Sequence, residues 1–214
     1  MKLHSFVAEI AFFLLILLVF VCPQFFYFNM QINPEYFTAW KFPYAQLILA
    51  LFGFALYLFF YEKQERKMIV FPLVFTVSLL FCVALFIKFF SSLPAFYQEA
   101  EIQVSRPDSL LAWAFCLLNF FSAAFYEEII YRFYLTDALY SLISRKAKAR
   151  FWLYFAEVFA GLCFAAAHLY LGVFSVINAA FAHVILRLCY KKTGSIWPGV
   201  TAHFIYNVIS LILL

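Results

Sequence analysis

Charged residues are scarce in this chain, and so are the residues that interrupt or cross-link a fold. Aspartate, glutamate, lysine and arginine make up 12% of the 214 residues, about half of their usual share in soluble domains. Five glycines and seven prolines are too few for a collagen-like or linker-rich protein. The five cysteines stand singly without a CxxC pair, so the sequence contains no disulfide framework. The net charge of +4 is too small to indicate a nucleic-acid partner.

Apolar residues dominate instead, at 67% of the chain, and the mean hydropathy is +0.94. A soluble globule of this length could not bury that much apolar surface in one core. Disorder is also excluded, because it requires low hydrophobicity and high charge. The apolar runs are much longer than the ~9–11 residues of a membrane β-strand. We therefore predict an all-α fold, a polytopic transmembrane helical bundle.

Seven apolar runs approach the ~20 residues that span a bilayer. They cover 5–28, 43–61, 69–93, 110–135, 151–171, 173–190 and 196–214. The first run is too long for a signal peptide and no A-x-A site follows it, so we count it as a span. The fourth run continues to Ser144 without a strong breaker, which is too long for one perpendicular span. We expect it to tilt, kink or turn into an interfacial helix around Thr136–Asp137.

The basic residues predict the orientation, because lysine and arginine gather in cytoplasmic loops. Eleven of the 15 fall at the amino terminus, in the second and fourth loops and beside the sixth run. They are Lys2, Lys63, Arg66, Lys67, Arg145, Lys146, Lys148, Arg150, Arg187, Lys191 and Lys192. This pattern predicts a cytoplasmic amino terminus, an external carboxyl terminus and a multi-pass protein of the inner (plasma) membrane.

Ionisable residues inside the apolar runs need a reason, since a charge at the bilayer centre costs at least ~2.5–3.5 kcal/mol. Some have simple structural explanations. Glu157 is two turns from a basic loop, and His183 suits a neutral histidine packed between helices.

Glu127 and Glu128 are different, because they are adjacent carboxylates that follow an apolar run in FSAAFYEEIIYRF. Two carboxylates this close resist joint ionisation, which suits a general base or acid. Arg132 is four residues after Glu128 and shares its helical face, so that it can neutralise Glu128 and leave Glu127 free for chemistry. A buried ion network that only holds helices together is the structural alternative.

Two further polar motifs lie in later runs. His168 ends FAAAH, and His203 and Asn207 stand four apart in TAHFIYN. Bringing these side chains to the two carboxylates is the cheapest way to satisfy all of them in lipid. A carboxylate base with neutral hydrogen-bond donors fits the hydrolysis of an amide bond. On straight perpendicular helices, however, Glu127 and His168 differ in depth by most of the bilayer, so the helices must be strongly offset or the helix after Ser144–Arg150 must start late.

Together these motifs resemble those of the CPBP family, also called the Abi or CAAX-protease-and-bacteriocin-processing family of intramembrane endopeptidases, which includes the type II CAAX prenyl endopeptidase. Its EExxxR motif corresponds to Glu127–Arg132, its FxxxH motif to Phe164–His168, and its HxxxN motif to His203–Asn207. The resemblance covers 110–214 and predicts a catalytic helical core there. Residues 1–109 are predicted to be transmembrane helices without an assignable motif.

The resemblance implies a role for each motif residue. Glu127 would activate the attacking water, Glu128 and Arg132 would support and orient it, and His168 would position the water. His203 and Asn207 would form the oxyanion site. We expect no cofactor, because no HExxH spacing exists. Zinc held by Glu127, His168 and His203 is the alternative.

Other functions stay open beside the protease. One is a non-catalytic membrane protein of the same fold that acts in bacteriocin immunity or as a scaffold. Another is a small proton-coupled transporter with a Glu/His/Arg relay. A haem protein with histidine ligands lacks an attachment motif. The expected partner of a protease is a membrane-embedded or lipid-anchored protein or peptide, in a prokaryotic cell and without an assumed prenyl group.

Overall fold

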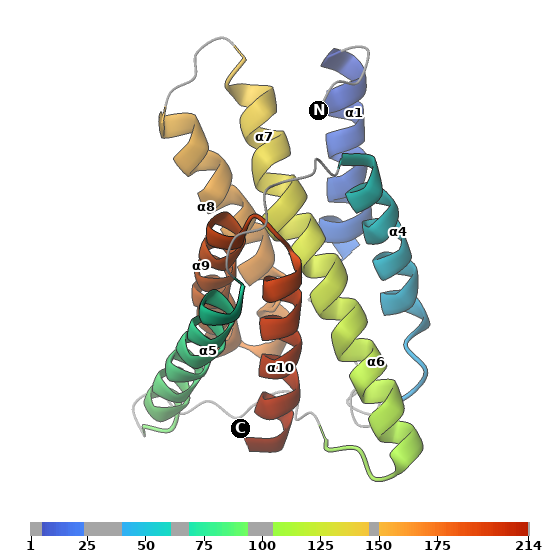
Figure 1. Ribbon diagram of the computed structural model, residues 1–214, viewed down its shortest axis with the longest axis vertical. Coiled ribbons are helices and arrows are strands. Elements are labelled where there is room, and N and C mark those ends of the chain that lie inside the picture. The colour runs from blue at the N-terminus through green and yellow to red at the C-terminus, as the bar shows by residue number, and fades with distance from the viewer. Residues whose placement is uncertain (1–5, 24–39, 61–68, 94–104, 146–149, 214) are drawn as a thin grey trace.

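The computed structural model describes residues 6–23, 40–60, 69–93, 105–145 and 150–213. Within these ranges the chain forms helices and no strand, which confirms the predicted all-α class (Figure 1). The helices are α1 (Phe6–Ile16) with the π turn η1 (Leu17–Val21), α4 (Tyr44–Phe60), α5 (Val70–Ser91), α6 (Leu110–Glu127), the π-helix η2 (Glu128–Tyr134), α7 (Leu135–Ile143), α8 (Arg150–Ala166), the 3₁₀ turn η3 (Leu169–Leu171), α9 (Val173–Thr193) and α10 (Trp197–Leu213).

Among the described residues, three helical stretches are long and apolar enough to cross a membrane, namely Val70–Ser91, Leu110–Ile143 and Val173–Thr193. Phe6–Val21, Tyr44–Phe60 and Trp197–Leu213 are shorter apolar helices. The number of spans and the orientation stay predictions. Six of the basic residues behind the orientation lie outside the described ranges: Lys2, Lys63, Arg66, Lys67, Lys146 and Lys148.

The central feature of the fold is one rod, in which α6, η2 and α7 follow one another over 34 residues (Figure 1). The rod begins at Ser109, whose hydroxyl oxygen accepts a hydrogen bond from the Ala112 main-chain N–H as an N-cap. The predicted turn around Thr136–Asp137 is wrong, because both residues lie inside the helix α7. Leu135, Thr136 and Ala138 are buried where α7 packs against α1 and α8, so tertiary packing sustains the helix.

The other helices surround this rod. α1 contacts α7, α4 packs along α6, and α8 and α9 cover η2 from other directions. α10 contacts α6, α9 and α5, while α5 lies outermost against α9. The α7–α8 hairpin extends beyond the ends of α9 and α10 (Figure 1). This offset brings the end of α8, and with it His168, to the middle of the rod, and it removes the difference in depth that straight, level helices would impose.

Candidate active site

The two adjacent carboxylates lie at the point where the rod changes helix type. Glu127 is the last residue of α6 and Glu128 is the first of η2. Single π turns within α-helices are rare and are frequently found at functional sites. The side chain of Glu128 is 1% exposed, whereas that of Glu127 is 14% exposed. The two neighbours therefore have different surroundings.

Glu128 is held from three directions. Its Oε1 accepts a hydrogen bond from Nδ1 of His203 at 3.0 Å and lies 3.4 Å from Nε of Arg132. Its Oε2 faces Gly199 on α10, where a side chain would collide: a Cβ built there would lie 2.7 Å from Oε2. This carboxylate has little freedom to move, and its charge is compensated by the arginine.

Glu127 is less constrained. Its Oε2 is 3.8 Å from Nε2 of His203, beyond hydrogen-bond distance, and its carboxylate takes part in a side-chain hydrogen bond with Tyr126. It is also close enough to His168 and Tyr170 to interact with them electrostatically. One carboxylate is thus engaged by its neighbours, and the other keeps acceptor capacity towards the space between His168 and His203.

Arg132 is fully buried and lies against an aromatic ring. Its Cζ lies 3.9 Å from the centroid of the Phe164 ring on α8, in cation–π geometry. Its three guanidinium nitrogens make no hydrogen bond to a described residue, and Nε has Glu128 as its ion-pair partner. Phe164 also contacts Tyr131 and the imidazole rings of His168 and His203, so this one ring links the three motifs.

His168 lies in the turn after α8, where its ring orientation is set by the main chain. Nδ1 donates to the carbonyl oxygen of Phe164 at 2.9 Å. With Nδ1 committed as the donor, Nε2 of the neutral ring is an acceptor. Such an atom can accept a hydrogen bond from a water molecule and leaves the lone pairs of the water oxygen free.

Five of the six predicted site residues are thus brought together: Arg132, His168 and His203 at the Phe164 ring, and Glu127 and Glu128 beside His203. Asn207 lies one turn after His203 on α10 and is half-buried. Its amide makes no hydrogen bond within the described part of the chain, so no hydrogen bond joins Asn207 to the other five site residues. No three His, Cys, Asp or Glu side chains among the described residues are arranged to hold a metal ion, including the zinc set Glu127, His168 and His203.

Sequence reasoning missed the residues that support the site from outside the motifs. Gly199 makes room for Glu128, and Arg187 on α9 donates to the main-chain carbonyl of Arg132 in η2. A signal for Arg187 was present: His183, Arg187 and Lys191 recur every four residues, and this spacing forms a polar stripe on an otherwise apolar helix. Glu157, explained earlier by a nearby basic loop, pairs with Arg187 and Lys191 of this stripe.

Replacing Gly199 with alanine is expected to destabilise the protein and lower its activity. The new methyl group would push against Glu128, and overpacking of a tight site typically costs about 1–3 kcal/mol of the free energy of unfolding. Unfolding by SDS titration in bicelles measures the loss. Shortening Glu128 to aspartate in the same chain should recover part of it. A Gly199→Ala protein as stable as the wild type would contradict the close contact.

Residues 109–209 match the family model described as type II CAAX prenyl endopeptidase Rce1-like. The match includes all six predicted site residues. No curated protein and no solved structure gives a match to the chain.

Proposed function

We propose that the chain is an intramembrane endopeptidase of the CAAX type, from the match of residues 109–209 to the Rce1-like family model, and that Glu127 activates the attacking water. One observation carries the choice of residue. Glu128 is held by His203, Arg132 and the backbone at Gly199, while the adjacent Glu127 keeps acceptor capacity at the same site. A general base must have a free lone pair within reach of water, and Glu127, 14% exposed against 1% for Glu128, meets this condition better.

In the proposed reaction, water lies between Glu127 and Nε2 of His168. Glu127 removes a proton as the water oxygen attacks the carbonyl carbon of the scissile peptide bond. The tetrahedral intermediate then collapses, the C–N bond breaks, and the proton held by Glu127 passes to the leaving amine. No group outside the chain is consumed other than water. The side chains of Arg132 and Glu128 keep their positions throughout and orient His203.

The negative charge on the carbonyl oxygen requires hydrogen-bond donors, each typically worth ~2.7–4 kcal/mol. Nδ1 of His203 already donates to Glu128, so Nε2 donates only when the ring carries both protons. The amide of Asn207, on the same face of α10 and without a hydrogen bond among the described residues, supplies the second donor. We propose that this pair forms the oxyanion site.

The proposal extends to substrate and location. A site among apolar helices receives its substrate through lipid, as a lipid-anchored or membrane-embedded peptide. The donor set of carboxylates, imidazoles and an amide completes the reaction without a metal, so we expect purified active protein to tolerate chelators. The site would act in the inner membrane of a prokaryotic cell.

Newly formed protein termini test the proposal most directly. Membranes of cells that carry either the wild type or Glu127→Gln at equal abundance are compared by mass spectrometry of termini. Termini that disappear in the variant establish proteolysis and identify the substrate. Identical termini under all growth conditions would overturn the proposal in favour of the immunity or scaffold function. An ion flux that depends on Glu127 would favour the transporter.

A further inference from the structure

Arg187 connects three segments that surround the candidate active site. Its Nε donates to Glu157 of α8 at 3.0 Å, and its Nη2 donates to Asp137 of α7 at 2.7 Å. Its Nη1 donates to the main-chain carbonyl of Arg132 in η2. The residue is 5% exposed, and each of its three nitrogens has a partner. The planar guanidinium fork suits such simultaneous contacts, which a lysine ammonium could not reproduce.

The hydrogen bond to the Arg132 carbonyl connects Arg187 to the candidate active site. Arg132 faces Glu128 with its side chain, and no hydrogen bond from a described residue restrains its guanidinium. Its main chain is restrained by Arg187 instead. We propose that Arg187 is a positioning residue, which fixes the π turn so that Arg132 and Glu128 hold their catalytic geometry. This inference rests on the proposed function of the same site.

Replacing Arg187 leaves no buried carboxylate without an ion-pair partner. Glu157 keeps Lys191 as an ion-pair partner, and the side chain of Asp137 is 56% exposed. Arg187→Gln is therefore expected to fold. Arg145→Gln is a matched control, because it also breaks an ion pair between helices, the one between Arg145 and Glu9, but it does not contact η2.

Steady-state cleavage of the substrate identified from the termini distinguishes the two variants. Arg187→Gln should lower kcat about tenfold or more with little change in KM, because a misplaced catalytic group costs rate more than binding. The kcat of Arg187→Lys should lie between those of Arg187→Gln and the wild type. Arg145→Gln should reduce stability but leave kcat unchanged. An equal loss of kcat in both arginine-to-glutamine variants would reduce Arg187 to a structural role.

Backbone amide hydrogen exchange separates this inference from the proposed function. Arg187→Gln should exchange faster than the wild type at Glu128–Tyr134, with no change in α10. If the wild type cleaves nothing, the proposed function fails, and faster exchange at η2 still supports the restraint. If the wild type is active and exchange at η2 is unchanged, the positioning inference is overturned.

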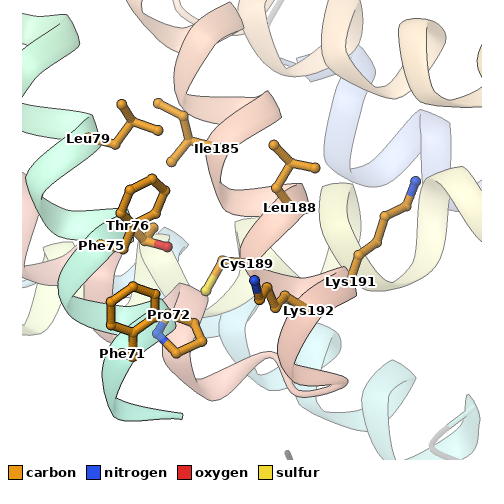
Figure 2. Close-up of a pocket in the computed structure, with 10 residues that line it drawn as sticks. All are labelled: Phe71, Pro72, Phe75, Thr76, Leu79, Ile185, Leu188, Cys189, Lys191 and Lys192. Atoms are coloured by element: carbon orange, nitrogen blue, oxygen red, sulfur yellow. The ribbon is translucent and has the colours of Figure 1, made fainter. Parts of the chain in front are cut away.

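A second observation concerns the lipid-facing side of α9, where a groove lies on each flank. The α5–α9 groove, of about 700 Å³, is lined by aromatic and aliphatic side chains that include Phe71, Phe75 and Ile185 (Figure 2). The α8–α9 groove, of about 360 Å³, is lined by Val158, Leu162 and Val184 among others. Leu188 and Lys191 line both grooves and form the ridge between them.

Positive charge is in excess at one end of this ridge. Arg187, Lys191 and Lys192 gather there with two carboxylates, Glu157 and Asp137. Within the described residues, Lys192 has no ion-pair partner, and Figure 2 shows it reaching towards the α5–α9 groove while Lys191 points away from it. Basic pockets between transmembrane helices bind anionic lipid headgroups.

We infer that the ridge of α9 binds a two-chain phospholipid with a net negative headgroup. One acyl chain would occupy each groove, and the phosphate would pair with Lys192. The two apolar grooves that diverge from a shared ridge match two acyl chains, and the single excess positive charge matches one phosphate. The grooves do not include the carboxylates of η2, although Arg187 lines the α8–α9 groove, and the inference does not depend on the proposed function.

Spin-labelled lipids test the inference with the protein in phosphatidylcholine vesicles. Electron paramagnetic resonance should show a larger motionally restricted fraction for spin-labelled phosphatidylglycerol than for phosphatidylcholine. Lys192→Gln should reduce this preference about fivefold, as expected for one basic residue near the membrane surface. Lys88→Gln, which removes one charge at the opposite end of α5, should leave it unchanged.

Three results would overturn this site. The first is the absence of any preference for phosphatidylglycerol in the wild type, and the second is an equal loss in the Lys88 variant. The third is displacement of the restricted lipid by a farnesylated peptide at equal concentration, which would assign the grooves to substrate.

Discussion

The Glu127→Gln variant is expected to cleave its substrate about 10²–10⁴ times more slowly than the wild type, the usual contribution of a general base. Glutamine has nearly the same shape and keeps a hydrogen-bonding oxygen for Tyr126, but it cannot take a proton from water. Binding should be preserved, so kcat should fall while KM stays within about twofold. Rates measured with purified protein in lipid vesicles, on the substrate found from the termini, check this.

A matched variant excludes a general effect of removing a buried carboxylate. Glu9→Gln alters a carboxylate that is 5% exposed and paired with Arg145, and that interacts electrostatically with Tyr134 at the end of η2 opposite Glu127 and Glu128. It should retain the wild-type kcat at temperatures where it is folded. Loss of kcat in both variants, or full activity of Glu127→Gln, would show that Glu127 is not the base. In the latter case Glu128 would be the next carboxylate to test.

Replacing Arg132 with methionine is expected to lower the free energy of unfolding by about 3–5 kcal/mol, more than the other substitutions proposed for this chain. Removing one partner of a buried ion pair leaves the other charge uncompensated, and that cost exceeds the worth of the pair itself. Here Glu128 would keep only its hydrogen bond to His203. The contact with Phe164 would lose its cationic component as well. SDS titration in bicelles measures the free energy of unfolding.

The double variant Arg132→Met, Glu128→Gln separates these contributions. If the uncompensated carboxylate causes most of the loss, neutralising it should recover more than half of the stability without restoring activity. A double variant as unstable as the single one would assign the loss to packing against Phe164 instead. Arg132→Lys should also be poorly tolerated, because an ammonium cannot stack on the ring as a planar guanidinium does.

Helix positions were predictable because apolar run length reports them directly. The predicted runs 43–61 and 69–93 became Tyr44–Phe60 and Val70–Ser91. The run from Leu110 was predicted less well, since its length required an irregularity whose place the sequence did not show. The π turn lies at Glu128–Tyr134, earlier than expected. Its position depends on contacts from other helices, such as the one Arg187 makes with the Arg132 carbonyl.

The motif residues were predictable as a set for a similar reason. A charge or an imidazole in an apolar run is costly, so each one had to find partners in another helix. The family resemblance that these residues carry is confirmed by the match over 109–209. The roles proposed for the residues stay predictions. Asn207 shows the limit of spacing, because it shares a helical face with His203 but has no hydrogen bond to the site.

By itself, the sequence determined that this is a helical membrane protein with a polar site made of residues far apart in the chain. Composition and run length decide that much, because lipid admits few charges and requires the backbone to satisfy itself. Only the tertiary structure decided which carboxylate is held and which has acceptor capacity, and how His168 reaches the middle of the rod. Those features depend on the offset between packed helices, and residue spacing within one helix carries no information about that offset.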